Sequence, residues 1–349
     1  MNLVNLNILD EAQGLIGCLS NQKTTKSYRR YDDKEDVLDL PDDFAADEAK
    51  ILSSKAFRVM SDKTQVFTLP HNALVRNRQK HVHEVVAISV VTSEMLGLNT
   101  NLVRAAALGH DIGHVPFGHQ GEAWMAKAMN QPTFCHEVMG PIVCQSIERR
   151  GRGLNLTWHT LEAMMCHSGD TAHEGMSQEA WVLRHTDKFA YLFHDYNDIG
   201  TRMEYPFPQE IVDLVNSFGA NQRERTTTAI CGLVIESARN NKVSFEVSEL
   251  GRKFQRLRKL MYKVYPCVTQ QDVDQNMSEV LKFLTMLNIG DPFLLLALMT
   301  DRDMATILSA SPMKDAGVLK QTSLKEITPY LKDIGQINLC DPDLDWKTI

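Results

Sequence analysis

The sequence predicts an all-α fold, and three observations lead to this class. Apolar residues recur at the helical period along most of the chain, beginning with residues 46–60. Alternating β-branched residues, which would indicate strands, are almost absent, and 242–247 is the one weak exception. Residues suited to helix ends separate the periodic stretches, such as Gly97 at a C-terminus and Thr100 at an N-terminus.

The predicted elements follow one another with short breaks. Residues 1–20 predict a short helical lead-in, and the polar residues 21–45, with Pro41 as a breaker, predict a surface loop or a mobile insertion. A short extended piece, 63–67, follows the first core helix. The helices that the periodicity predicts are 46–60, 79–95, 101–112, 120–129, 138–149, 160–167, 178–196, 208–218, 221–239, 246–265, 271–288, 292–309 and 323–333.

Length and composition exclude several classes of protein. At 349 residues, the chain can form one large domain or two smaller ones. Its net charge of −7 argues against coating nucleic acid or a membrane by bulk charge. The seven cysteines include no CxxC pair, which favours reduced thiols over a disulfide framework. Neither a signal peptide nor an apolar run of roughly 20 residues is evident, so we expect a soluble, cytoplasmic protein.

Residues 110–122 carry most of the chemistry. Three histidines and two carboxylates fall within these thirteen positions, and all twelve histidines of the chain lie between His71 and His194. Imidazole and carboxylate groups together suit a first-row divalent cation, and the glycines between them allow sharp turns. A polar loop with incidental histidines is the alternative, but chance scatter does not easily produce such a concentration.

Four side chains form a candidate metal site. His81 lies at the start of one predicted helix, and His110 and Asp111 lie at the end of the next. Adjacent helical residues are about 100° apart, but near a helix end both side chains can reach one ion. A fourth ligand should come from another helix, and Asp187 is the best candidate.

Asp187 is chosen because of the helix face on which it lies. With Tyr191, His194 and Asp195 it occupies one side of the predicted 178–196 helix, where an apolar stripe is usual. A solvent-facing stripe is the alternative. Two nitrogen and two or more oxygen ligands fit an open Mn²⁺, Mg²⁺ or Fe²⁺ site better than a closed zinc site, with Co²⁺, Ni²⁺ and Zn²⁺ as alternatives. Open positions would let a water and a phosphate oxygen share the ion.

An ordered set of short motifs resembles the HD-domain phosphohydrolases and, more closely, the deoxyguanosine triphosphate triphosphohydrolase family. The resemblance is close over residues 46–200 and loose over 257–264. The motifs that carry it are 53–67, Arg78–His81, Glu84-Val85, 110–122, Gly153–Thr157 and Asp187–Asp195.

The resemblance implies an HD-domain helical fold with additional C-terminal helices. Residues 1–45 would be a lead-in and loop, 46–200 the phosphohydrolase core, and 201–349 a helical lobe packed on it. The implied reaction is metal-dependent hydrolysis of a dNTP to deoxynucleoside and inorganic triphosphate, with attack at the α-phosphorus. The implied role is control of dNTP pools or defence against phage.

Two other functions remain open from the sequence. One is a different HD phosphohydrolase, acting on nucleoside monophosphates, guanosine polyphosphates or cyclic dinucleotides. The other is a non-catalytic nucleotide-sensing subunit. The first of these needs only the four metal ligands, so the additional motifs favour the dNTP reaction over it.

The resemblance also assigns roles within the site. On the matching positions, His81, His110, Asp111 and Asp187 would hold the metal. His119 and Glu122 look like the catalytic pair of the family. They are three residues apart at the start of a predicted helix and so share a face, where the carboxylate can orient the imidazole for acid–base work. A helix-capping role is the alternative for His119. His136 resembles a further active-site histidine, which would protonate the 5′-oxygen or hold a phosphate.

The remaining matches concern the substrate. Arg78 is suited to an α-phosphate oxygen, His114 to the phosphates, and Lys188 to the rest of the triphosphate. The ring of Tyr191 would stack near the sugar and exclude a 2′-OH. The residues that would bind the 3′-OH are Asp195 and Gln65, although a polar turn is an alternative role for Gln65.

Some positions depart from the family pattern. Val115 replaces a usual proline, and Glu137 follows His136 where asparagine is commoner. The metal ligands are unchanged. These departures therefore leave open which substrate is preferred, and they do not argue against activity. The 21–45 insertion differs from the relatives, which leaves open whether bound nucleotides control the protein.

A basic run without an intervening acid lies further along the chain. A solvated helix face is its default interpretation, followed by contact with a substrate triphosphate, and then by binding of single-stranded DNA at a subunit groove. We expect a homo-oligomer and no membrane partner. The run consists of Arg252, Lys253, Arg256, Arg258, Lys259 and Lys263.

Overall fold

The computed structural model describes residues 3–31, 42–68, 74–269, 272–310 and 316–348. Within these ranges the regular structure is helical, and extended pairing is confined to two isolated bridges, Arg29–Thr157 and Thr64–Asn77. The all-α prediction is therefore confirmed. Among the described residues, every helix is too short or too polar to cross a membrane.

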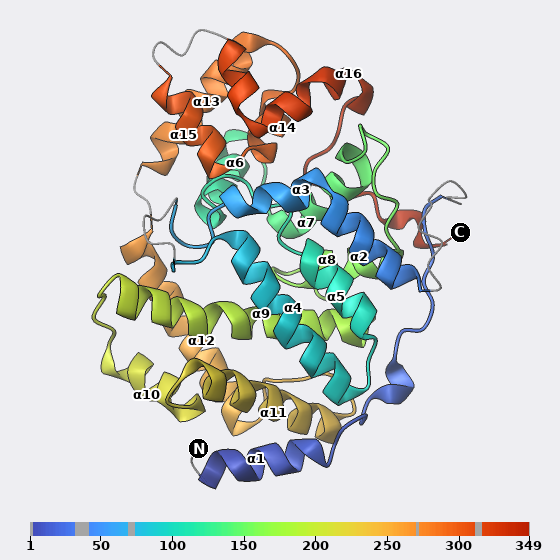
Figure 1. Cartoon of the computed structure of the whole chain (residues 1–349), viewed down its shortest axis with the longest axis vertical. Coiled ribbons are helices and arrows are strands. Elements are labelled where there is room, and N and C mark those ends of the chain that lie inside the picture. The colour runs from blue at the N-terminus through green and yellow to red at the C-terminus, as the bar shows by residue number, and fades with distance from the viewer. Residues whose placement is uncertain (1–2, 32–41, 69–73, 270–271, 311–315, 349) are drawn as a thin grey trace.

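The helices appear in Figure 1 in chain order from blue to red. They are α1 (Leu3–Gln13), α2 (Asp43–Ser53), α3 (Lys55–Val59), α4 (Arg78–Leu96), α5 (Thr100–Gly109), α6 (His119–Ala128), α7 (His136–Ile142), α8 (Trp158–Cys166), α9 (Gln178–Asn197), α10 (Gln209–Phe218), α11 (Gln222–Asn240), α12 (Glu249–Val268), α13 (Val273–Leu287), α14 (Pro292–Leu298), α15 (Asp301–Ser309) and α16 (Leu331–Ile334).

The centre of the molecule is built from α4, α5 and α9, which pack on one another (Figure 1). Local signals set their ends. The side chain of Asn77 caps α4 by accepting from the backbone of Lys80. Gly97 ends α4 in the left-handed conformation, with φ of 78°, as predicted. Asn99 caps α5, so the predicted cap Thr100 is instead the first helical residue.

Later helices cover this centre from two sides. At one end α1 packs on α11, which itself contacts α9 and α4. At the other end α13 contacts α6, the helix that carries His119. Figure 1 shows α1 and α11 at the bottom and α13 to α16 at the top. Residues beyond 200 thus support the centre on both sides, while the boundaries at 45 and 200 remain a prediction. Residues 32–41 of the expected loop lie outside the described residues.

Several helix predictions are wrong in detail. The predicted helix 46–60 is divided at Ser54, whose side chain caps α3, and the predicted helix 138–149 continues after α7 as a π-helical turn, Val143–Ile147. The predicted helix 292–309 is two helices, because Thr300 and Asp303 form a capping box that starts α15 anew. The predicted helix 323–333 is mostly two short 3₁₀ turns, and only its end, in α16, is α-helical.

Residues 242–247, the one weak strand signal, form a loop between α11 and α12. The carboxylate of Glu236 accepts from the backbone N–H groups of Glu246, Val247 and Ser248 at 2.7–3.0 Å. These donors are therefore satisfied without a neighbouring strand.

Candidate active site

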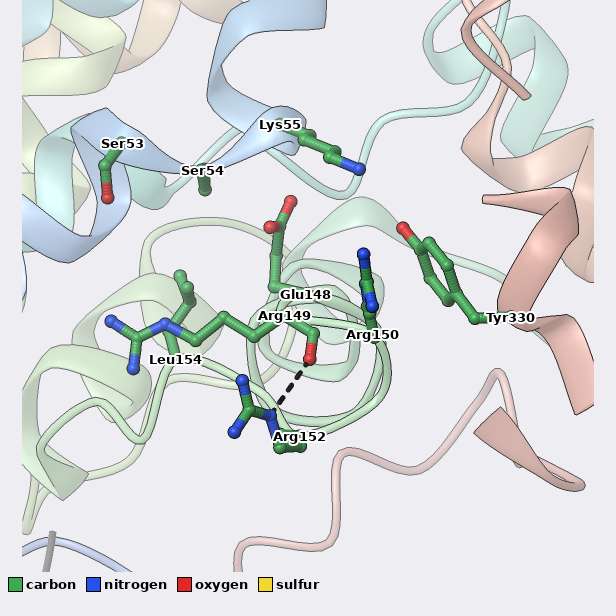
Figure 2. Close-up of a pocket in the computed structure, with 9 residues that line it drawn as sticks. All are labelled: Ser53, Ser54, Lys55, Glu148, Arg149, Arg150, Arg152, Leu154 and Tyr330. Atoms are coloured by element: carbon green, nitrogen blue, oxygen red, sulfur yellow. Dashed lines mark hydrogen bonds between the residues drawn. The ribbon is translucent and has the colours of Figure 1, made fainter. Parts of the chain in front are cut away.

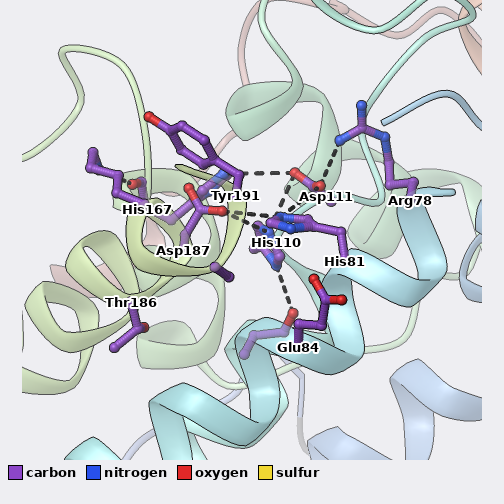
Figure 3. A network of polar contacts seen from close by, with 12 residues as sticks. Arg78, His81, Glu84, His110, Asp111, His167, Thr186, Asp187 and Tyr191 are labelled. Atoms are coloured by element: carbon purple, nitrogen blue, oxygen red, sulfur yellow. Dashed lines mark hydrogen bonds and ion pairs between the residues drawn. The ribbon is translucent and has the colours of Figure 1, made fainter. Parts of the chain in front are cut away.

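The four predicted metal ligands meet where α4, α5 and α9 converge. His81 Nε2 lies 3.1 Å from Asp187 Oδ1 and 3.8 Å from Asp111 Oδ2. His110 Nε2 lies 3.5 Å from Asp111 Oδ1 and 3.8 Å from Asp187 Oδ1. Figure 3 shows His81, Asp111 and Asp187 pointing toward one another, and all four side chains are buried.

The chemistry of these donors fits a divalent cation. His110 Nδ1 donates to the carbonyl of Ala107 at 2.6 Å, so its Nε2 carries the lone pair. That Nε2 is buried and has no hydrogen-bond partner among the described residues. Burial opposes charge on Asp111, but His110, Arg78 and His114 outweigh it and hold the pKa of this carboxyl well below its usual range. A metal ligand of this kind must be ionised, and Asp111 meets that condition.

Arg78, predicted to contact the α-phosphate, lies beside the ligands. Its guanidinium donates to Asp111 Oδ2 at 2.6 Å and to the carbonyl of Thr64 at 2.6 Å. The second bond joins the start of α4 to the segment that contains Gln65. Oε1 of Gln65 is buried and lacks a hydrogen-bond partner among the described residues.

Glu122, on α6, gathers three histidines. Its Oε1 lies 2.6 Å from His114 Nδ1 and 3.0 Å from His136 Nδ1, and its Oε2 lies 3.1 Å from His119 Nδ1. Glu122, His114 and His136 are buried, whereas the side chain of His119 is 70% exposed. The predicted pair of His119 and Glu122 is thus in contact, and its imidazole is accessible from solvent.

The two buried histidines beside Glu122 differ in charge. Burial, Arg78 and His136 lower the pKa of His114 to about 3, so this ring is neutral. Burial also opposes charge on His136, but Glu122 and Glu137 outweigh it and raise its pKa to about 9.

His167 is a member of the site that the sequence did not reveal. It follows the last residue of α8, and its Nε2 lies 3.1 Å from His136 Nε2 and 3.9 Å from Asp111 Oδ1. Its position within the histidine-rich part of the chain was the available signal. Nothing in the local spacing shows that α8 directs this ring toward Asp111.

Asp301, at the start of α15, is a second missed residue. Its Oδ1 accepts from the backbone of Phe117 at 2.9 Å and from the hydroxyl of Thr64 at 2.6 Å. Its Oδ2 accepts from the backbone of Thr64 at 2.7 Å. The C-terminal part of the chain thus holds the segments that lead to Gln65 and to His119.

Lys188 is buried next to the ligand Asp187. Its ammonium donates to the carbonyls of Arg184 at 2.5 Å and His167 at 3.3 Å. Burial lowers the pKa of Lys188 to about 7. The structure therefore gives this predicted phosphate contact two partners within the protein.

The polar face of α9 points into the protein, since Asp187 and Asp195 are buried. Asp195 accepts from Arg76 through Oδ1 and from the hydroxyl of Tyr265 at 2.8 Å through Oδ2. The hydroxyl of Tyr191 lies 3.4 Å from that of Tyr262 on α12. The residues expected around the sugar are thus joined to α12.

The basic run also lies on α12, and part of it forms surface ion pairs. Arg256 contacts Glu210 at 2.7 Å, and Lys253 contacts Glu249 at 2.7 Å. Exposed pairs of this kind agree with a solvated helix face.

A separate cavity of about 410 Å³ lies at the surface. Lys55, Arg149, Arg150 and Tyr330 are among the residues that line it (Figure 2). None of its lining residues belongs to the histidine cluster or to the predicted substrate set.

Comparison with known proteins agrees with the geometry. The family model described as HD domain matches residues 78–195, which include the four predicted metal ligands. A deoxyguanosinetriphosphate triphosphohydrolase-like protein of Caldanaerobacter subterraneus subsp. tengcongensis is 35% identical over 233 residues, covering 66% of this chain and 68% of that protein. Proteins of the same name from Clostridium tetani and Clostridium perfringens are 33% and 34% identical, and each is 68% covered.

Fold, site and matched domain define a metal-dependent phosphohydrolase of the HD class. Within that class, the chain belongs to the deoxyguanosinetriphosphate triphosphohydrolase-like family, so the predicted resemblance is confirmed.

Proposed function

We propose that the protein hydrolyses a deoxynucleoside triphosphate to deoxynucleoside and inorganic triphosphate. The observation that carries this proposal is the contact of Glu122 with three histidines beside the metal ligands. An HD phosphohydrolase with a simpler substrate needs only the metal ligands. The names of the relatives support the same substrate class.

His81, His110, Asp111 and Asp187 hold a divalent cation in this proposal, and Mn²⁺ or Mg²⁺ fits the mixed nitrogen and oxygen donors. When bound, the ion polarises the phosphoryl group and lowers the pKa of water. Because these four side chains are buried, they would shield a bound ion from bulk water on the protein side.

His119 carries the proton transfer. Its Nδ1 donates to Glu122, which leaves Nε2 as the atom that exchanges a proton with the reacting groups. Because this side chain is exposed, a substrate in the site can reach it. Water adds to the α-phosphorus, the bond from phosphorus to the 5′-oxygen breaks, and the 5′-oxygen takes up a proton.

Arg78 and the histidines bind the phosphates. The guanidinium of Arg78 contacts Asp111, so an α-phosphate oxygen held by Arg78 lies next to the metal ligands. His114 and His136 contribute from the opposite side of Asp111, at 3.3 and 3.6 Å from its Oδ1. Lys188 would release its carbonyl partners to reach the outer phosphates.

Tyr191, Asp195 and Gln65 select the deoxyribose. The ring of Tyr191 excludes a 2′-OH, while Asp195 accepts a hydrogen bond from the 3′-OH and the side-chain amide of Gln65 donates one to the 3′-oxygen. A site built in this way rejects ribonucleotides by exclusion at C2′ and retains deoxyribonucleotides by capture at C3′.

Product analysis tests the proposal. Purified protein is incubated with each dNTP, alone and in pairs, with Mn²⁺ or Mg²⁺, and the anions are separated by ion chromatography. We expect inorganic triphosphate and deoxynucleoside in equal amounts, and little product from ribonucleotides. Release of orthophosphate or pyrophosphate would favour another HD phosphohydrolase, and absence of cleavage would favour a nucleotide-sensing subunit.

A further inference from the structure

The aspartate that begins α15 contacts two segments of the site through one side chain. Asp301 is 1% exposed, so its carboxylate lies inside the protein. Its Oδ1 accepts hydrogen bonds from the backbone N–H of Phe117 at 2.9 Å and from the hydroxyl of Thr64 at 2.6 Å. Its Oδ2 accepts from the backbone N–H of Thr64 at 2.7 Å. One carboxylate from the C-terminal part of the chain therefore joins two segments that are distant in sequence.

The turn that leads to His119 has an unusual backbone. Phe117 and Gly118 have positive φ angles of 64° and 54°, and Gly118 is the residue immediately before α6. A left-handed conformation is unfavourable for a bulky residue such as phenylalanine, so neighbouring contacts must hold it. The bond from the N–H of Phe117 to Asp301 is such a contact, and it comes from outside the turn.

The turn also lies close to Arg78. A Cβ atom at Gly118 would lie 3.2 Å from a guanidinium nitrogen of Arg78, and a Cβ atom at Gly121 would lie 1.9 Å from the carbonyl oxygen of Pro116. The chain therefore has little room here for a different path. A shift of the turn would move the start of α6 relative to Arg78.

The position of His119 depends on this turn because its imidazole is not enclosed by other side chains. The side chain is 70% exposed, and it bonds to Glu122 on the same helix at 3.1 Å. A contact within one helix can set the orientation of the ring, but it does not place the helix. The distance from the imidazole to the metal ligands is therefore sensitive to where α6 begins.

The other contact of Asp301 affects Gln65 and Arg78. Thr64 directly precedes Gln65, and its carbonyl accepts from the guanidinium of Arg78 at 2.6 Å. The backbone N–H of Arg78 in turn donates to the carbonyl of Lys63 at 3.2 Å. Residues 63 and 64 are thus held by Asp301 on one side and contact the start of α4 on the other.

We propose that Asp301 is a positioning residue, whose carboxylate fixes the turn before His119 and the segment before Gln65 in one geometry. Its three hydrogen bonds go neither to a metal ligand nor to the pair of His119 and Glu122, so it acts through these two segments. Since α13 contacts both α6 and α15, Asp301 holds the turn from an element that is itself packed against α6 through α13 (Figure 1).

The roles of His119 and Gln65 in turnover rest on the proposed function, whereas the position of the His119 ring can be measured without a substrate. If no dNTP is cleaved, the proposed function fails, and the position of the ring still tests the role of Asp301.

A second aspartate in the same turn of α15 provides a matched control. Asp303 is 5% exposed and likewise accepts from N–H and O–H donors, which belong to Thr300 and Ser323. These partners lie outside the two segments that Asp301 contacts. Asp303→Asn therefore changes a comparable buried carboxylate without removing a bond to the turn or to Thr64.

Kinetics of the full chain provide the first measurement. In Asp301→Asn, one of the two oxygens becomes an NH₂ group, which cannot accept from a backbone N–H. We expect kcat for the dNTP to fall roughly 10²-fold, as a misplacement of about 1 Å can cause. Metal content by ICP-MS should be unchanged, and Asp303→Asn should retain the kcat of the unmodified protein.

NMR of isotope-labelled histidine in the Mg²⁺-loaded protein provides the second measurement. The ring signal of His119, assigned by its absence in His119→Ala, should show hydrogen on the Nδ1 atom that donates to Glu122. In Asp301→Asn this signal should broaden or shift toward that of an unconstrained histidine. In Asp303→Asn it should stay unchanged.

A milder variant keeps the test available should Asp301→Asn not fold. Thr64→Val removes only the hydroxyl bond to Oδ1 of Asp301, and it should shift the His119 signal in the same direction by less. An unchanged His119 signal in whichever of these two variants folds would overturn the proposal.

Discussion

Two buried polar regions lie beside α4 and α9, and they differ in the groups that surround their carboxylates. Around Arg76, one guanidinium contacts Glu84 at 2.7 Å, Asp198 at 3.1 Å and Asp195. Around Asp111, most neighbours are histidines, and Nε2 of His110 has no hydrogen-bond partner among the described residues. The first region contains its own positive charge. The second contains the guanidinium of Arg78 beside Asp111, but its unpartnered imidazole nitrogen still offers a lone pair to a cation, as expected of a metal site.

Removal of a metal ligand should have the largest effect. Asp187→Ala deletes the carboxylate that His81 contacts at 3.1 Å, so the metal site loses one of its two carboxylate ligands. We expect metal content at that site to fall to background by ICP-MS and turnover to become undetectable. Unchanged metal content would show that Asp187 is not a ligand.

Removal of the proton-transfer group should separate chemistry from metal binding. His119→Ala deletes an exposed side chain whose Nδ1 lies 3.1 Å from Glu122, and it leaves the four metal ligands in place. Turnover should fall by roughly 10²–10⁴-fold, as is typical for loss of a general acid or base. Metal content should stay as in the unmodified protein, and its loss would contradict the assigned role.

Loss of the cation in the region around Arg76 should lower the stability of the metal-free protein. Arg76→Met leaves three carboxylates without their shared cation, two of them buried. Breaking a buried ion pair in this manner costs about 3–5 kcal/mol of unfolding free energy. Urea unfolding of the metal-free protein should show this loss, whereas metal-free Asp187→Ala should lose less. Equal losses would remove the distinction between the two regions.

The carboxylate of Glu236 is stabilised by N–H and O–H donors and not by a cation, so we expect its removal to have a smaller effect on stability than removal of Arg76. Burial raises its pKa, but bonds from Ser244, Ser248 and the backbone of 246–247 outweigh this and lower it to about 2. A carboxyl with a lowered folded pKa stabilises the protein above its unfolded pKa of about 4.5, and that stabilisation is lost as pH falls toward 2.

Glu236→Gln should therefore destabilise the protein by about 1–3 kcal/mol at pH 7, since hydrogen bonds to a charged acceptor are lost. The difference from the unmodified protein should shrink between pH 4.5 and 3 in thermal unfolding curves. A difference that stays constant with pH would show that charge on Glu236 contributes nothing.

Much of the site could be predicted from the sequence because its signals are local. His110 and Asp111 are adjacent, His119 and Glu122 share one turn, and helical periodicity brings out the polar face that contains Asp187. The caps of α4 and the N-terminal cap of α5 are local as well, which is why these three ends fall within one residue of the prediction, whereas α5 ends three residues early.

The residues that were missed depend on packing between distant segments. His167 belongs to the site only because α8 packs on α5 and α9. Asp301 lies 184 residues after its partner Phe117, and no spacing rule connects them. The break before α15 was readable in principle, since Thr300 and Asp303 have the spacing of a capping box.

The cluster around Asp111 is, in our proposal, a metal-dependent site for dNTP hydrolysis. Its most direct test is ion chromatography of the products from chelator-stripped protein, before and after Mn²⁺ is restored, with Asp187→Ala as the control. We expect no product before addition, and inorganic triphosphate with deoxynucleoside afterwards in the unmodified protein alone. Equal cleavage without metal, or orthophosphate as the product, would contradict it.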